Sequence, residues 1–165
     1  MSATLVRLAT PSDLPAAAAM AGQLVRQHHA QDPGRFLLVD EVEAGYRWWF
    51  ERELARSGEA ILLVATQDGR HVGYAYGTKE GRDWNMLLDD HGAIHDIFVA
   101  TEARKSGVGK ALLEALVTRL ESLGASRIVL STMVSNTAAQ ALFRTLGFRP
   151  TMLEMTRGPS QSSSP

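Results

Sequence analysis

The sequence predicts an α/β fold, with a single domain built around a central mixed β-sheet. Short runs rich in β-branched residues alternate along the chain with longer stretches of helical periodicity. Two of the apolar runs are joined through Asp68-Gly69, and this dipeptide is a strong signal for a β-hairpin. With 165 residues, the chain has the length of one domain that buries its own core.

The first half of the chain predicts three strands and two helices. Ser12 or Asp13 is placed to cap the first helix, which runs through an alanine-rich stretch. The expected elements are a strand at 4–8, a helix from that cap to about residue 28, a loop at 31–40, a helix at 41–56, and hairpin strands at 60–66 and 71–79.

The second half contains the clearest helix, in which leucines recur at helical spacing until Gly124 supplies the stop. Ser135 or Asn136 is placed to cap another helix that ends near Gly147. The expected elements are an irregular loop at 80–91, a strand at 93–99, helices at 108–123 and after the cap, and strands at 127–133 and 148–155. We expect the domain to span residues 1–157, followed by a disordered tail rich in serine and proline at 158–165.

Composition excludes several classes of function. The chain has no cysteine, so disulfides, a thiol nucleophile and cysteine–zinc sites are ruled out. A net charge of −1 argues against a nucleic-acid partner, which usually selects for a basic face. No apolar run approaches the ~20 residues that span a bilayer, and the N-terminus lacks the pattern of a signal peptide. We therefore expect no membrane partner and a cytoplasmic location.

A site is predicted where the strand that ends at Val99 is followed by a basic loop and a helix. The loop from Arg104 to Lys110 combines positive side chains, two glycines and a helix N-terminus, a combination that binds phosphate groups. The motif is not a P-loop, because Arg104 and Ala111 replace the required glycine and hydroxyl residue. It is not a dinucleotide fingerprint either, because Leu112 stands at the last glycine position.

Three segments, in order along the chain, resemble the GNAT superfamily of acetyl-CoA-dependent N-acetyltransferases. Arg104-x-x-Gly107-x-Gly109 is similar to the acetyl-CoA signature of that superfamily. The stretch from Asn136 to Phe148 resembles its C-terminal motif, Asn-x-x-Ala-x-x-Leu-Tyr-x-x-x-Gly-Phe. The opening residues 5–14 resemble its usual first strand and helix start.

The resemblance implies a mostly antiparallel sheet with a splayed parallel pair, helices on both faces, acetyl-CoA as co-substrate, no metal, and a homodimer. Free backbone groups of the strand at Ile97, Phe98 and Val99 would pair with the pantetheine arm. Backbone N–H groups of the loop would bind the diphosphate, while Asn136 and Phe143 would contact the rest of the co-substrate. The expected acetyl-CoA-binding residues are Ile97, Phe98, Val99, Arg104, Lys105, Ser106, Gly107, Val108, Gly109, Lys110, Asn136 and Phe143.

His95 and Asp96 are the candidate catalytic residues. An alkylamine with a pKa of ~10 must lose a proton before it attacks a thioester, and histidine is suited to accept that proton near neutral pH. Asp96 would bind the incoming ammonium or take the proton through water. Adjacent strand residues point to opposite faces, and a β-bulge would relax this constraint. The alternative is a histidine bonded to a backbone carbonyl and an aspartate engaged in a turn.

Phe143 departs from the superfamily pattern, in which a tyrosine at this position can protonate the departing CoA thiolate. Phenylalanine has no proton to give, but a thiol of pKa ~8.5 can leave without an acid. Tyr74, Tyr76 or a water molecule are possible substitutes. Near the acceptor site, adjacent Trp48 and Trp49 cannot share one helical face fully, which leaves one of them to line a pocket.

The sequence thus predicts an N-acetyltransferase that transfers the acetyl group from acetyl-CoA directly to a primary amine of a small molecule. Direct attack is favoured because no nucleophile lies near the motifs. Two alternatives remain open. In the first, the acceptor is a protein N-terminus or lysine. In the second, the chain is a non-catalytic CoA-binding regulatory module, which the absence of a hydroxyl at Phe143 allows.

Overall fold

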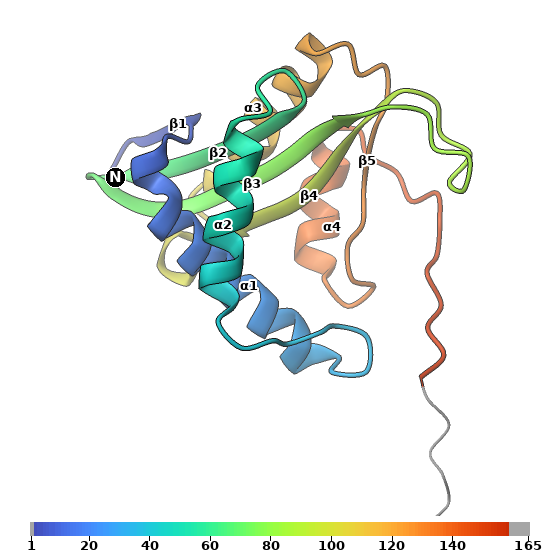
Figure 1. Ribbon diagram of the computed structural model, residues 1–165, viewed down its shortest axis with the longest axis horizontal. Helices are drawn as coiled ribbons and strands as arrows, with labels where there is room; N and C mark the ends of the chain where they lie inside the picture. Colours follow the sequence, from blue (N-terminus) through green and yellow to red (C-terminus); the bar gives the residue numbers. More distant parts are fainter. Residues whose placement is uncertain (1, 159–165) are drawn as a thin grey trace, which may run out of the picture.

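The computed structural model describes residues 2–158, which form four α-helices and five strands joined by short connections (Figure 1). Single 3-10 turns at Pro11–Asp13 and Thr101–Ala103 precede α1 and α3. The elements are β1 (Thr4–Leu8), α1 (Leu14–Gln31), α2 (Val42–Leu54), β2 (Ala60–Gln67), β3 (Arg70–Glu80), β4 (His91–Val99), α3 (Val108–Ser122), β5 (Ile128–Leu130) and α4 (Thr137–Thr145).

The strands form one mixed sheet in the order β1-β2-β3-β4-β5. The pairs β1–β2, β2–β3 and β3–β4 are antiparallel, whereas β4 and β5 are parallel. Parallel strands need a crossover connection, and α3 provides it between β4 and β5. The predicted fold class, a mostly antiparallel sheet with one parallel pair, is confirmed.

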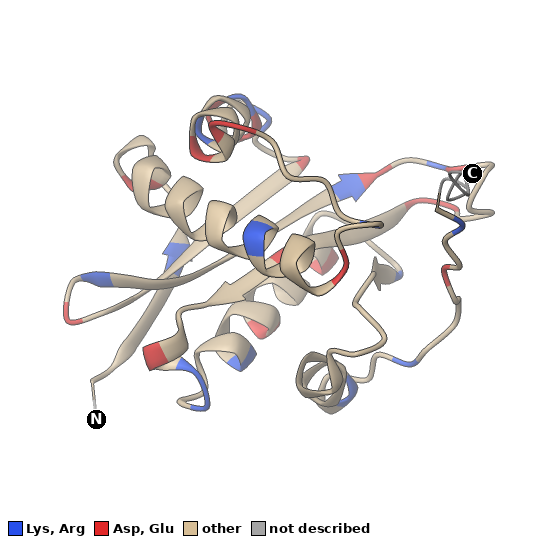
Figure 2. Cartoon of the chain, turned by 90° about the horizontal axis from the view of Figure 1, so that it is seen from below, with Lys and Arg blue, Asp and Glu red and all other residues tan. Residues whose placement is uncertain are grey.

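Helices cover both faces of the sheet, as predicted. Figure 1 shows α1 and α2 in front of the strands and α3 and α4 behind them. The α3 face buries the leucines of the predicted helical stripe, among them Leu112, Leu116 and Leu120, which have no exposed surface. The opposite face buries a cluster of aromatic residues around Phe50, Tyr74 and Tyr76. Charged residues gather mainly on the loops and outer helix surfaces (Figure 2).

A buried carboxylate anchors the start of α1 to the sheet. The side chain of Asp13 is 3% exposed and accepts hydrogen bonds from both terminal nitrogens of Arg7 on β1, at 2.7 and 2.8 Å. The backbone N–H and the hydroxyl of Thr10 donate to it at 2.8 Å each, and Nε2 of His71 on β3 lies 2.7 Å away. These donors, Arg7 foremost, hold the pKa of Asp13 well below its usual range.

Most predicted elements are present, but the last strand is not. Asn136 caps α4 by accepting a hydrogen bond from the N–H of Ala139 at 3.1 Å, and Gly124 has the positive φ of 88° that ends α3. The predicted strand at 127–133 shortens to the three residues of β5. Residues 148–155 form no strand.

The missing strand has a physical explanation in the exposure of its side chains. Met152, Leu153 and Met155 are 81%, 68% and 86% exposed, so the apolar residues that indicated a strand do not face the core. Pro150 lacks the N–H that a ladder needs. An ion pair between Arg35 and Glu154 holds the segment instead. Residues 159–165 of the predicted tail lie outside the described residues.

Candidate active site

The candidate site lies where β4 and β5 separate. The two strands pair only at 92–128, 93–129 and 94–130, while β4 continues to Val99. Within residues 2–158, no strand pairs with this edge of β4 beyond Ile94. A cavity of about 90 Å³ opens at the separation, and its lining includes His28 on α1, His95 and Asp96 on β4, and Asn136 and Phe143 at α4.

A β-bulge brings the two candidate catalytic residues to the same face of the sheet. Tyr76 pairs with Asp96 and the next residue, Gly77, pairs with Ile94, so His95 has no partner on β3. Gly77 lets the backbones of β3 and β4 lie close together here, because a Cβ on Gly77 would lie 2.8 Å from the carbonyl oxygen of Ala93. The β-bulge that would relax the constraint on His95 and Asp96 is therefore present, and both residues line the same cavity.

His95 rests against the aromatic face of β3. Its ring stacks on Tyr76, with ring centroids 5.2 Å apart and an interplanar angle of 27°. Its Nε2 lies 2.7 Å from the hydroxyl oxygen of Thr78 and 3.9 Å from Oε1 of Glu80. The side chain is 40% exposed, so a solute in the cavity can reach it. The partner of the imidazole is therefore a side chain, and not the backbone carbonyl of the alternative interpretation.

Asp96 is a partly buried carboxylate with a single hydroxyl donor. The phenol of Tyr74 donates to its Oδ2 at 3.1 Å. Burial raises the pKa of Asp96 above its ordinary value, although the bond from Tyr74 and the nearby His95 and His28 act in the opposite direction. Asp96 lies within β4, so the alternative that it is engaged in a turn is wrong. The charged form of this carboxylate is stabilised by any cation that enters the cavity.

Aromatic side chains of α2 and β3 form the wall beside these two residues. Trp49 meets the edge of Tyr76 at a centroid distance of 5.0 Å, whereas Trp48 is 61% exposed and lies under the guanidinium of Arg52. Of the two tryptophans, Trp49 is the one on the site side of α2. Burial and then the charge of Asp96 raise the pKa of Tyr46 to about 12, which keeps its phenol protonated.

The wall is fixed by a buried acid. The phenol of Tyr76 donates to the carboxylate of Glu53, which also accepts from Nη1 of Arg56 at 2.9 and 3.1 Å. Burial, followed by the bond to Glu53, raises the pKa of Tyr76. The hydroxyls of Tyr74 and Tyr76, named above as substitutes for the missing tyrosine, thus both donate to carboxylates.

The loop after β4 has the geometry of an anion site. Lys105 and Gly107 take the left-handed conformation, with φ of 61° and 88°, and the hydroxyl of Ser106 donates to the carbonyl of Ala103 at 2.6 Å. Helix α3 begins at Val108, so the N–H groups of its first turn have no acceptor within the helix. The Nε–H of Arg104 donates to the carbonyl of Val99 at 3.1 Å, which ties the loop to the strand.

The remaining predicted contacts divide between the core and the opening. Phe98 packs in the aromatic core, and Ile97 and Val99 pack on the α3 side, so these side chains are structural while their backbone edge is open towards β5. Phe143 lines the cavity and contacts Phe148, with ring centroids 6.2 Å apart. A Cβ on Gly109 would lie 3.3 Å from a methyl carbon of Leu142 on α4, so the start of α3 adjoins the helix that carries Phe143.

Sequence reasoning missed three polar residues beside His95 and its aromatic wall: Glu53, Thr78 and Glu80. A signal was present for two of them, because residues 74, 76, 78 and 80 alternate onto one face of β3. Glu53 carries no such signal, since its partner Tyr76 lies on another element. Among residues 2–158, no three histidine, aspartate or glutamate side chains come together as a metal site. None of the helices described is both long and apolar enough to cross a bilayer.

Comparison with known proteins relates this geometry to a family. The acetyltransferase (GNAT) family matches residues 23–148. An L-methionine sulfoximine/L-methionine sulfone acetyltransferase of Pseudomonas aeruginosa is 34% identical over 102 residues, which are 61% of this chain and 56% of that protein. The chain therefore spans about half the length of this relative. A ribosomal protein bS18-alanine N-acetyltransferase of Escherichia coli is 30% identical over 114 residues, which are 68% of this chain and 72% of that one.

Solved structures share the fold. Glucosamine-6-phosphate N-acetyltransferase from Arabidopsis thaliana superposes with a TM-score of 0.71 at 17% identity, covering 94% of this chain and 97% of that one. An aminoglycoside N-acetyltransferase in complex with CoA gives a TM-score of 0.75 at 20% identity, covering 97% of both chains. The sequence match and the splayed sheet agree, and the chain belongs to the acetyltransferase (GNAT) family.

Proposed function

We propose that this protein is an acetyl-CoA-dependent N-acetyltransferase that transfers the acetyl group directly to a primary amine of a small molecule. The observation that carries the proposal is the β-bulge, where a histidine and a carboxylate share one face beside the opening between β4 and β5. Membership of the family supports the reaction class. The aromatic wall and Asp96 support an acceptor that carries a positive charge in solution.

The residues of the opening fit acetyl-CoA. The first turn of α3 offers unpaired N–H groups to a diphosphate, and Gly107 places no Cβ in their way. The open edge of β4 from Ile97 to Val99 offers N–H and C=O groups to an extended amide arm, as a neighbouring strand would. Bound there, acetyl-CoA supplies a thioester carbonyl that an amine can attack.

The chain's own residues then account for the proton. Asp96 attracts the ammonium form of the acceptor, and His95 accepts the proton that the amine must lose. An N–H at the β4 edge near Ile97 polarises the thioester carbonyl. Phe143 supplies an apolar contact and no acid, so the thiolate leaves unassisted, which its pKa of ~8.5 permits.

The acceptor class is the finer part of the proposal. A carboxylate at a cavity of about 90 Å³ favours a small cationic amine over a folded protein surface. The Pseudomonas aeruginosa relative is named for L-methionine sulfoximine and sulfone, which also favours a small acceptor. The Escherichia coli relative, named for an alanine of ribosomal protein bS18, favours a peptide N-terminus as the second candidate. A homodimer and a cytoplasmic location stay predictions, the first supported by the exposed methionines and leucine of residues 152–155.

A competitive panel tests the proposal. Deuterium-labelled acetyl-CoA is offered with amino acids, polyamines, aminoglycosides, amino sugars and peptides with free N-termini, and products are read by mass spectrometry. We expect label on one or a few small amines, and a loss of at least 100-fold in rate with His95→Gln. Label on peptides alone would favour the second candidate. CoA binding without transfer to any amine would leave a regulatory module.

A further inference from the structure

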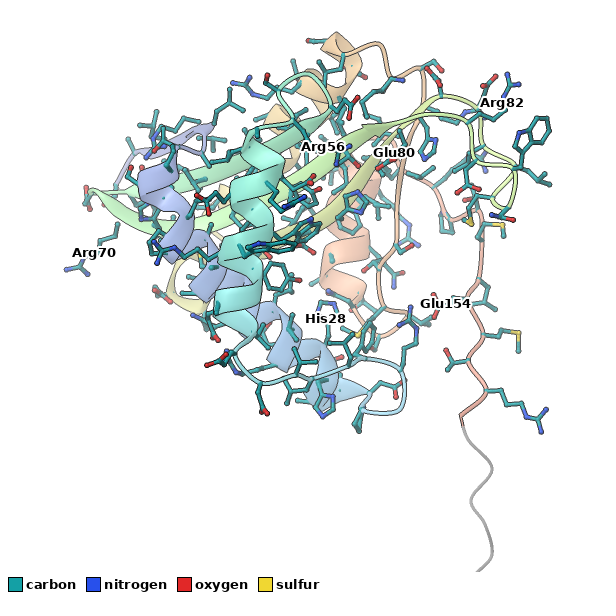
Figure 3. All side chains as sticks on the ribbon, viewed as in Figure 1. His28, Arg56, Arg70, Glu80, Arg82 and Glu154 are labelled. Carbon is teal, nitrogen blue, oxygen red and sulfur yellow. The ribbon has the colours of Figure 1, made fainter. Side chains whose placement is uncertain are left out.

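Two polar side chains continue the line of His95 away from the cavity. Thr78 lies on β3 beyond Tyr76 on the same face, and Glu80 follows it at the end of the strand, where Figure 3 labels it. The hydroxyl of Thr78 donates to Oε1 of Glu80, and the hydroxyl oxygen of Thr78 lies 2.7 Å from Nε2 of His95. Glu80, Thr78 and His95 therefore form one hydrogen-bonded row.

The number of protons in this row fixes the form of the imidazole. A threonine hydroxyl has one proton to donate, and an ionised carboxylate only accepts. Because the hydroxyl proton goes to Glu80, the contact between Nε2 and the hydroxyl oxygen needs a proton on Nε2. In the neutral ring the lone pair is then on Nδ1. In residues 2–158, no protein group hydrogen-bonds to this Nδ1.

The row is also held rigidly. Thr78 is 2% exposed, and its β-branched side chain has few rotamers, so its hydroxyl is fixed in direction. The imidazole is stacked on Tyr76, whose own phenol is bonded to Glu53. Rotation of the His95 ring would break the bond to Thr78 and leave a buried hydroxyl oxygen without its donor, which is unfavourable.

We propose that Thr78 and Glu80 are positioning residues that hold His95 with its Nδ1 as the proton acceptor for the amine. The inference rests on the proposed function and deepens it. Glu80 stabilises the imidazolium that forms, acting across the Thr78 hydroxyl as the acid of a catalytic triad acts directly. Neither residue touches the acceptor amine in this arrangement.

Acetyl transfer forms one bond to the acetyl carbon and breaks another. The amine nitrogen forms a bond to the acetyl carbon while the bond from that carbon to sulfur breaks, and sulfur leaves with the electron pair. One proton of the ammonium passes to Nδ1 of His95, and the proton on Nε2 stays in the hydrogen bond to Thr78. The second proton, which the nitrogen loses as the amide forms, goes to the departed thiolate. The positive charge of the ring then faces the negative charge of Glu80, 3.9 Å from Nε2.

Other ionisable groups surround His95 and enter its pH dependence. On its own strand Asp96 is adjacent, and on β3 Glu80 and the phenol of Tyr76 face the ring. Glu53 of α2, paired with Arg56 just after that helix, acts through Tyr76, and from α1, His28 lines the same cavity. Of the carboxylates, Glu80 is the one joined to the imidazole through a hydroxyl, so its removal is the specific perturbation.

Four variants of the full chain, Thr78→Val, Thr78→Ser, Glu80→Gln and His95→Gln, test the row, with acetyl transfer followed from pH 5.5 to 9.5. Thr78→Val removes the hydroxyl at nearly constant volume, and Thr78→Ser restores it. We expect kcat at neutral pH to fall about 10-fold or more with Thr78→Val and to stay within about 3-fold with Thr78→Ser, while KM for acetyl-CoA is unchanged in both. With Glu80→Gln, the acid limb of kcat should move to lower pH, since the imidazolium loses a stabilising negative charge.

A second readout does not depend on activity. Two-bond ¹⁵N–¹H spectra of the histidine rings show which nitrogen carries the proton, and His95→Gln identifies the signal. We expect the Nε2–H form in the unaltered protein and in Thr78→Ser, and a mixture of both forms in Thr78→Val. A dominant Nδ1–H form in the unaltered protein would overturn the inference, whatever the kinetics.

Failure of the inference is distinguishable from failure of the proposed function. If His95→Gln abolishes the acid limb while Thr78→Val and Glu80→Gln retain the original rate and profile, the row is overturned and His95 stays the base. If His95→Gln leaves rate and profile unchanged, the base assignment itself is overturned, and the inference with it.

Discussion

Replacement of Asp13 by asparagine tests how the first strand is joined to the first helix. The variant keeps the shape of the side chain but removes the negative charge that Arg7, His71 and Thr10 share. An amide has one oxygen and cannot accept from both terminal nitrogens of Arg7 and from Thr10 at once. The site is 3% exposed, so water does not replace the lost bonds.

The expected cost follows from the burial of the two partners. Removing one member of a buried ion pair costs about 3–5 kcal/mol. The side chain of Arg7 is 39% exposed, so solvent screens part of its interaction, and we expect the lower end, about 3 kcal/mol of unfolding free energy. For a domain of this length that corresponds to a fall in Tm of about 6–12 °C.

The stability that the Asp13 carboxylate contributes should depend on pH in one direction. Because its donors hold the pKa of Asp13 well below the ordinary value, the stabilisation is fully present above pH ~4 and is lost as pH falls through the lower folded-state pKa. The gap between the unaltered protein and Asp13→Asn should therefore be constant from pH 8 to 5 and narrow below pH ~4. Urea unfolding at each pH measures it, with Asp40→Asn, an exposed carboxylate, as control. A gap below 1 kcal/mol at pH 7, or one that persists undiminished to pH 2, would refute the reasoning.

Three further variants address the site. Asp96→Asn should leave the unfolding free energy at pH 7 equal or higher, because burial raises the pKa of the carboxyl and makes its charged form unfavourable. This gain in stability should vanish below pH ~4, where the carboxyl is protonated in the folded and the unfolded state. The KM for a cationic amine should rise in the same variant. Gly107→Ala, with φ at 88°, should weaken CoA binding in calorimetry, whereas Gly69→Ala, with φ at 76° in the β2–β3 turn, should leave CoA affinity unchanged despite strain of ~1–2 kcal/mol in each. Phe143→Tyr should change kcat by less than about 3-fold, and a rise of 10-fold or more would mean that protonation of the thiolate limits the rate.

Signals within a few neighbouring residues correctly predicted the helices and turns that such residues determine. The leucine stripe of α3, its stop at Gly124 and the cap at Asn136 each act within one helix, and the structure has all three. The hairpin of β2 and β3 turns at Asp68 and Gly69, which take positive φ as the dipeptide predicted. The basic loop before α3 likewise needed only neighbouring residues to be recognised.

The remaining features depend on partners distant in sequence. The strand expected at 148–155 had the residues of a strand but pairs with no strand of the sheet, which periodicity alone does not show. The bonding of His95 to Thr78 depends on the register of β3 against β4, and that register shifts by one residue at the bulge. A single sequence shows that His95 and Asp96 are adjacent, but their shared face follows from the register.

A single-turnover experiment at neutral pH addresses the proposed reaction itself. Excess protein is mixed with labelled acetyl-CoA and the preferred amine, and quenched samples are analysed for acetyl-CoA, acetylated amine and acetylated protein. Direct transfer with His95 as base predicts that acetylated amine appears at the rate at which acetyl-CoA disappears, that no acetylated protein forms, and that His95→Gln slows the step by at least about 100-fold. Accumulation of acetylated protein, or an equal rate in His95→Gln, would contradict it.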